Sequence, residues 1–160
     1  MPLPTEPAAS TAVAEAVGAW GDALGAEHVI TSSEALRRAG TATYKSSSTV
    51  AAVIRPANRE QVQRCLAIAN RFHVPVYPIS TGKNWGYGSR SPVKDGVLLD
   101  LGRMNRIVEL NEELAYVTVE PGVTQRQLHE ELRTRGSRLW MDATGASPDC
   151  SIIGNTLERG

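Results

Sequence analysis

The chain has 160 residues, which is enough for one ordinary domain with its own buried core. Its 17 acidic and 17 basic residues cancel, so no basic stripe indicates a nucleic-acid or anionic-membrane partner. No run is apolar enough to span a bilayer, and the first residues lack the basic and apolar regions of a signal peptide. These features predict a cytoplasmic protein with neither nucleic-acid nor membrane partners.

The N-terminal part is predicted to be helical after a loose, proline-containing start at 1–9. A first helix is expected over 10–24, and a second, short helix over 33–39. We expect 1–45 to form an N-terminal helical segment ahead of a domain that covers 46–160. The first helix has a regularly spaced apolar face made of Val13, Val17, Trp20 and Leu24.

A strand, a helix and a strand follow, which together make a βαβ unit. The β-branched run 50–54 predicts the first strand, and Asn58 with Gln61 forms a capping box that opens a helix to about residue 73. The second strand, 74–79, contains two prolines, which place it at an edge or an end of the sheet. The buried face of the helix is predicted to be Val62, Leu66, Ile68 and Ala69.

The remaining elements predict an α+β fold, with helices over a mixed sheet. Thr124 and Gln127 form a second capping box for a helix that ends at Gly136. The tail over 142–160 is rich in small and polar residues and is interpreted as a loop. Strands are expected over 97–101, 106–110, 115–120 and 138–141.

The glycine loop, residues 80–91, is the first segment with possible chemistry. Gly82, Gly86 and Gly88 permit positive φ, and successive amides in such a turn form a nest for an anion. Ser80, Thr81 and Asn84 add hydrogen-bond donors, and Lys83 adds a charge. The glycine spacing is neither that of a Rossmann loop nor that of a Walker loop. Composition alone leaves both a diphosphate loop and a long ordered turn open.

The second segment is 147–160, where Gly154, Asn155 and Thr156 suit a tight backbone beside a ligand, although a plain loop explains the segment better when it is taken alone. No metal site is expected, because His28, His73 and His129 have no ligand spacing. Cys65 and Cys150 are interpreted as buried or free thiols.

Several segments in one order carry a family resemblance: RP at 55–56, PISTGKNWGYG at 78–88, LD at 99–100, MNRI at 104–107, VEPGV at 119–123 and GNTLERG at 154–160. Together they resemble the FAD-binding domain of the vanillyl-alcohol oxidase and p-cresol methylhydroxylase (PCMH) flavoproteins. The resemblance implies a two-lobed PCMH-type domain, of which this chain holds the first lobe with its βαβ unit and mixed sheet. It also implies FAD as the cofactor, with its diphosphate held between the lobes, mostly by backbone amides.

The resemblance places two walls of the cofactor site on this sequence and gives Tyr87 a catalytic role beside the substrate. Tyr87 would bind the phenolate oxygen of a phenolic substrate, and the alternative is that its ring only packs the loop. Trp85 is expected to pack rather than react. The first wall is Ser80, Thr81, Gly82, Lys83, Asn84, Trp85, Gly86 and Gly88, and the second is Ile153, Gly154, Asn155, Thr156 and Gly160.

The implied reaction is oxidation of a 4-substituted phenol, by hydride transfer from the benzylic carbon to the flavin. Alternatives are a flavoenzyme for a hydroxy acid, sugar or natural product, or a non-catalytic remnant that binds a nucleotide or a partner. The electron acceptor would be oxygen or a cytochrome. The chain is expected to end before the family's domain is complete and to be inactive alone. We also expect it to expose an apolar face that pairs in a homo-oligomer or with a missing C-terminal domain.

Overall fold

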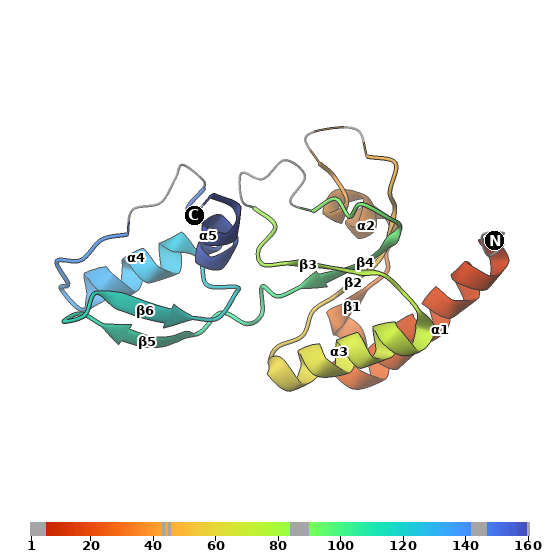
Figure 1. The fold of residues 1–160 in the computed structure, drawn as a ribbon, viewed down its shortest axis with the longest axis horizontal. Helices are drawn as coiled ribbons and strands as arrows, with labels where there is room; N and C mark the ends of the chain where they lie inside the picture. Colours follow the sequence, from red (N-terminus) through yellow and green to blue (C-terminus); the bar gives the residue numbers. More distant parts are fainter. Residues whose placement is uncertain (1–5, 43, 45, 84–89, 142–146, 160) are drawn as a thin grey trace.

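The computed structural model describes residues 6–42, 44, 46–83, 90–141 and 147–159, which form two groups of elements at opposite ends of an elongated molecule (Figure 1). The large group holds a four-stranded sheet, and the small group holds a separate two-stranded sheet. Helices accompany both sheets, which confirms the predicted α+β class. None of the helices in the described ranges is long and apolar enough to cross a membrane.

The large group begins with a long helix and ends with a central strand of the sheet. Its elements are α1 (Glu6–Leu24), η1 (Ala26–His28), β1 (Val29–Ile30), α2 (Ser33–Ala39), β2 (Val50–Ile54), α3 (Arg59–Phe72), β3 (Val76–Ile79) and β4 (Gly96–Asp100). Its strand order is β1-β2-β4-β3, with β2, β4 and β3 parallel and β1 antiparallel. The predicted βαβ unit, β2-α3-β3, is confirmed, but β4 lies between its two strands in the sheet.

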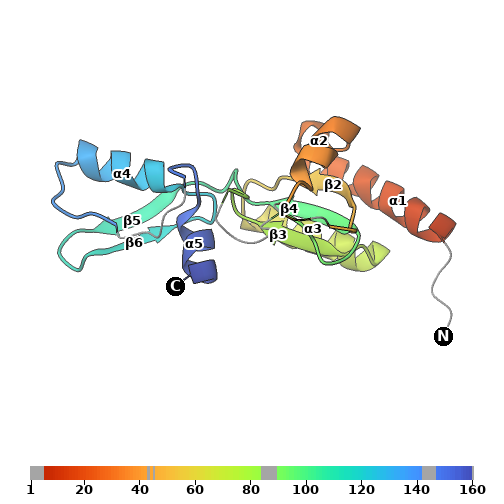
Figure 2. The same ribbon diagram turned by 90° about the horizontal axis from the view of Figure 1, so that it is seen from above.

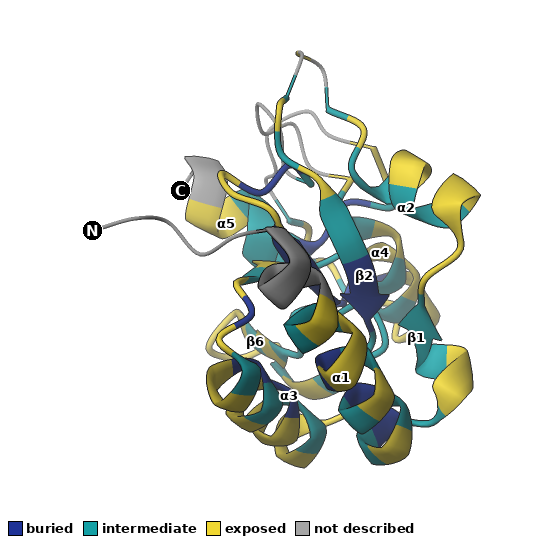
Figure 3. Cartoon of the chain, turned by 90° about the vertical axis from the view of Figure 1, so that its right-hand side faces the viewer, coloured by how far each residue is buried: buried dark blue, intermediate teal, exposed yellow. Residues whose placement is uncertain are grey.

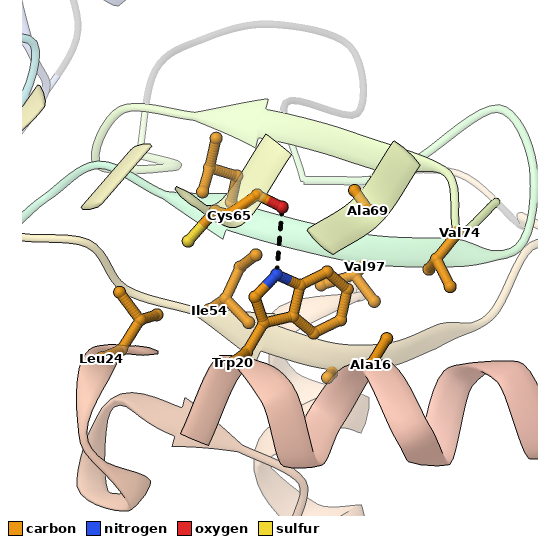
Figure 4. Close-up of a cluster of buried hydrophobic side chains, with 10 residues drawn as sticks. Ala16, Trp20, Leu24, Ile54, Cys65, Ala69, Val74 and Val97 are labelled. Carbon is orange, nitrogen blue, oxygen red and sulfur yellow. Dashed lines mark hydrogen bonds between the residues drawn. The ribbon is translucent and has the colours of Figure 1, made fainter. Parts of the chain in front are cut away.

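Helices cover both faces of this sheet, so β4 is buried except at its last residue and β2 is buried over its carboxyl-terminal half (Figure 3 shows β2). On one face α1 and α3 pack against β2 and β4, and the indole Nε1 of Trp20 donates to the carbonyl of Cys65 at 3.1 Å (Figure 4). On the other face Leu36 and Ala39 of α2 pack against Val53 and Leu98. Helix α1 therefore shares the core of the sheet, while a boundary at residue 45 stays a prediction.

The small group consists of a hairpin and two helices (Figure 2). The hairpin, β5 (Ile107–Asn111) and β6 (Tyr116–Val119), is antiparallel as predicted. Helix α4 (Gln125–Thr134) opens on the predicted capping box, because Thr124 accepts from the Gln127 amide while the Gln127 side chain accepts from the Thr124 amide. The last element is α5 (Ile152–Arg159).

Four predictions about these elements are wrong or incomplete. Leu66 is 44% exposed, because the inward stripe of α3 runs through Cys65 and Ala69, one position away. Helix α1 begins at Glu6, since Pro7 lies in its first turn, where a proline removes no helical hydrogen bond. Residues 138–141 form no strand. The predicted loop over 142–160 contains α5, because Ser151 provides a helix cap that the composition conceals.

Candidate functional site

The glycine loop begins directly after the carboxyl end of β3, and its first residues are Ser80, Thr81, Gly82 and Lys83. Gly82 has φ +64°, and an added Cβ there would stand 2.2 Å from Nε of Arg90. None of the amides of Ser80 to Lys83 donates a hydrogen bond to a residue that the structure describes. A short run of backbone donors is therefore available to a ligand next to the sheet.

Helix α5 begins opposite this loop and is fixed by the buried Ser151. The Ser151 hydroxyl accepts from the Gly154 amide at 2.8 Å, which is the contact of an N-cap. The Ile152 amide donates to the carbonyl of Val123 at 3.1 Å, and Thr124 bridges to Ser151. The start of α5, with its partial positive charge, is thereby held against the turn that precedes α4.

Residues 147–151 tie the start of α5 to the glycine loop across more than sixty residues of sequence. The hydroxyl of Ser151 donates to that of Ser80 at 2.5 Å, and the thiol of Cys150 donates to the carbonyl of Lys83. Cys150, like Cys65, is a buried free thiol, as predicted. These bonds fix the spacing between the loop and the helix.

An ion-pair cluster reinforces the same connection. Asp149 lies 3.1 Å from Nε of Arg126 and 3.4 Å from Nζ of Lys83. The hydrogen bond from Arg126, followed by the charge and hydrogen bond of Lys83, holds the pKa of the Asp149 carboxyl below its usual value. Two cations share one carboxylate, so the cluster keeps a net positive charge beside the loop.

A cavity of about 240 Å³ lies between the two walls. A diphosphate fits this place, because Ser80 and Gly82, whose amides donate to no described residue, and the first turn of α5 border it without a carboxylate in its lining. Apolar side chains form the rest of the lining and would exclude water from the anion. The lining residues are Tyr77, Pro78, Ile79, Ser80, Gly82, Leu101, Pro121, Ile153, Gly154 and Leu157.

The structure brings some of the predicted site residues together and separates others. Ser80 and Gly82 face Ile153 and Gly154 across the cavity. Asn155 and Thr156 instead line a second cavity of about 270 Å³, bounded also by α4 and the hairpin. The predicted site residues outside the described part of the chain are Asn84, Trp85, Gly86, Tyr87, Gly88 and Gly160.

Sequence reasoning missed Arg90, Asp149 and Ser151. Ser151 could have been found, because a serine directly before an apolar pair is a common helix start. Asp149 and Arg90 leave no such local signal, since their partners lie 23 and 66 residues away for Asp149 and nine residues away for Arg90.

A family model described as FAD binding domain matches residues 50–160. Two curated relatives match much of the chain. The chain is 51% identical over 146 residues to 1'-carboxy-chondrochloren decarboxylase of Chondromyces crocatus, covering 91% of this chain and 27% of the relative. It is 40% identical over 102 residues to the 4-cresol dehydrogenase [hydroxylating] flavoprotein subunit of Pseudomonas putida, covering 63% and 20%.

Two solved structures share the fold. Substrate-bound p-cresol methylhydroxylase superposes with a TM-score of 0.86 at 32% identity, covering 94% of this chain and 30% of the other. 4-Ethylphenol oxidase from Gulosibacter chungangensis, in an isoeugenol complex, gives 0.84 at 36% identity and the same coverage. This chain spans 20–30% of the length of these four relatives. The chain therefore belongs to the FAD-binding domain family of flavoproteins, in its p-cresol methylhydroxylase type, and FAD is its cofactor.

Proposed function

We propose that the diphosphate of FAD binds between the glycine loop and the start of α5, as part of a flavin-dependent oxidoreductase of 4-substituted phenols. The main observation in favour of this cofactor site is that the amides of Ser80 to Lys83, in the loop beside the cavity, donate to no described residue. Backbone amides held by a fixed loop bind an anion with little reorganisation. Ile153 and Gly154 supply the facing wall.

The described residues bind and orient, and the reactive chemistry belongs to the cofactor. When bound, FAD supplies the acceptor for a hydride. The loop and α5 fix its diphosphate, and the links Ser80–Ser151 and Lys83–Asp149 hold these two walls at a constant spacing. Leu101 and Pro121 help to keep water from the bound anion. Such fixed positioning is the main contribution that a protein makes to a cofactor-driven reaction.

The phenolic substrate class is supported by relatives whose names specify phenols. The 40%-identical relative is named for 4-cresol, and both solved structures are named for p-cresol or 4-ethylphenol. In this proposal Tyr87 donates its phenolic hydrogen to the substrate's phenolate oxygen. Of the proposed electron acceptors, a cytochrome is consistent with a relative named as a flavoprotein subunit, and oxygen with one named as an oxidase.

Replacing Tyr87 by phenylalanine tests the substrate class. The full-length gene product carrying Y87F should lose about tenfold to a hundredfold in kcat/KM with 4-ethylphenol, because it loses a hydrogen bond to a charged oxygen. Bleaching of the flavin absorbance under anaerobic conditions measures the reaction. The matched control is Tyr44→Phe, at an exposed tyrosine, which should react as the wild type does. Equal rates for Y87F and the wild type would contradict the proposed role.

A second candidate is oxidation coupled to loss of a carboxyl group, or oxidation of a hydroxy acid. The 51%-identical relative is named a decarboxylase, and relatives named for glycolate and D-lactate match at 32% and 33% identity. A hydroxy acid needs no phenolate donor, so Y87F should leave its turnover intact. Carbon dioxide release from a carboxylated substrate, with no bleaching by 4-ethylphenol, would favour this candidate.

A further inference from the structure

Buried polar atoms without partners gather at the two ends of the glycine loop. Oγ1 of Thr81, Nε of Arg90 and Oγ of Ser91 each lack a hydrogen bond in the described structure, and Ser91 is only 4% exposed. Burying a polar group unpaired is costly, and such groups concentrate where a ligand completes them. Only two other side-chain atoms in the described part of the chain share this condition, and they lie in Arg55 and Gln125.

Arg90 is held directly against the loop backbone. Its Nη2 donates to the carbonyl of Thr81 at 3.2 Å. Its Cγ, Cδ and Nε occupy the space that a Cβ of Gly82 would need, at 2.9, 3.1 and 2.2 Å from that position. Gly82 lines the 240 Å³ cavity, whereas Arg90 does not, so this contact places the guanidinium against a residue that forms the wall of the proposed diphosphate site.

The charges beside the loop differ in how far they are already neutralised. Lys83 and Arg126 share the carboxylate of Asp149. Arg90 has no carboxylate within ion-pair distance among the residues that the structure describes. A guanidinium has five N–H donors in a fixed plane and suits phosphate oxygens, yet among the described residues only Nη2 of Arg90 finds an acceptor.

We propose that Arg90 is a binding residue for the FAD diphosphate, with Nε–H and the free guanidinium N–H groups directed to phosphate oxygens and Thr81 Oγ1 as a neighbouring donor. This inference rests on the proposed cofactor site. With this assignment, the buried and unpaired Nε of Arg90 and Oγ1 of Thr81 both donate to the same anion. The assignment also gives Gly82 a second purpose, since any side chain at that position would displace the guanidinium.

The test compares ligands with and without phosphate in the wild type, Arg90→Met and Arg90→Lys. Calorimetric titration with FAD, ADP-ribose and adenosine separates loss of phosphate contacts from loss of the fold. Arg90→Met should weaken FAD and ADP-ribose about tenfold or more and leave adenosine unchanged. Arg90→Lys should recover part of the loss, because it keeps a charge but not the planar fork. The control is Arg38→Met, at an exposed arginine on α2, which should bind as the wild type does.

Each outcome decides between the two proposals. Equal weakening of ADP-ribose and adenosine by Arg90→Met would give Arg90 a structural role and overturn the inference. Unchanged affinity for ADP-ribose in both variants would also overturn it, while leaving the cofactor site intact. A wild type that binds neither FAD nor ADP-ribose would reject the proposed site itself. Thermal unfolding followed by circular dichroism identifies a variant that has lost its fold, and Arg90→Lys then decides.

Discussion

Two structural features require a glycine at position 82, namely its backbone conformation and the space beside its Cα atom. Its φ of +64° lies in the left-handed region, which costs an alanine energy that glycine does not incur. Its missing Cβ leaves the space that Arg90 fills. The sequence predicted a special backbone here from the glycine pattern. It could not predict Arg90, because that contact exists only when the loop folds back on itself.

Gly82→Ala should lower the free energy of unfolding by about 1 to 3 kcal/mol, the cost of a non-glycine residue in this region. It should also weaken FAD binding, since Arg90 is displaced. Urea unfolding measures the first effect and calorimetry the second.

The control is Gly18→Ala on α1, where nothing lies within 4 Å of the added methyl group. This change should stabilise the protein by about 0.5 to 1 kcal/mol, because alanine is the better helix former. Destabilisation of the same size at both positions would contradict the account of Gly82.

Among the elements, those set by local signals were predicted best. The capping box of α4 was predicted to the residue, because its two bonds join residues three apart. Helix α5 was missed, because the small and polar residues around it favoured a loop, although Ser151 before an apolar pair was a local signal for its start. The bonds that fix this start, from Ser151 to Ser80 and from the Ile152 amide to the Val123 carbonyl, join distant parts of the chain and leave no local signal. The buried stripe of α3 was shifted by one position at Leu66, since small Cys65 rather than large Leu66 faces α1.

Thr124→Ala should cost about 1 kcal/mol of stability, because the Gln127 amide loses its side-chain acceptor. Urea unfolding followed by circular dichroism measures it. Thr134→Ala, at the exposed end of the same helix, is the matched control and should stay within about 0.5 kcal/mol of the wild type. A cost at Thr134 equal to that at Thr124 would contradict the capping explanation.

At the scale of the whole molecule, the two groups are linked by the chain itself and by residues 147–151 (Figure 1). The family resemblance predicted both walls of the proposed site. It could not predict the bonds between them, because these join residues 66 to 71 apart. Large apolar side chains are exposed in the small group, with Trp140 at 79% and Leu157 at 82%. The predicted apolar face, and pairing through it, stay predictions.

Asp149→Asn should remove a pH-dependent part of the stability. The pKa of Asp149 is lowered in the folded protein, so its contribution is complete above the usual carboxyl pKa of 3.8. It is lost as the pH falls through the lower pKa of the folded state. The urea midpoints of the wild type and the variant should therefore differ at neutral pH and converge below about pH 3.8.

High salt should shrink the same difference at neutral pH, because the cluster is solvent-accessible and therefore screened. A gap between the midpoints that is constant from neutral to acid pH would show that asparagine acts through packing rather than through charge.

The order of the four-stranded sheet has a consequence for self-association. One edge strand of the sheet is β1, which has only two residues. The other edge strand is β3. The carbonyls of Pro75 and Ile79 accept hydrogen bonds from the amides of Val97 and Leu101 on the β4 side. Because the backbone groups of successive strand residues point to alternate sides, the backbone nitrogen of Pro78 faces away from the sheet. A proline nitrogen carries no hydrogen, and a strand arriving from another molecule would find no donor there. Both edge strands are therefore poor templates for pairing with a strand of another molecule. This protects a sheet with strongly apolar central strands from edge-to-edge aggregation.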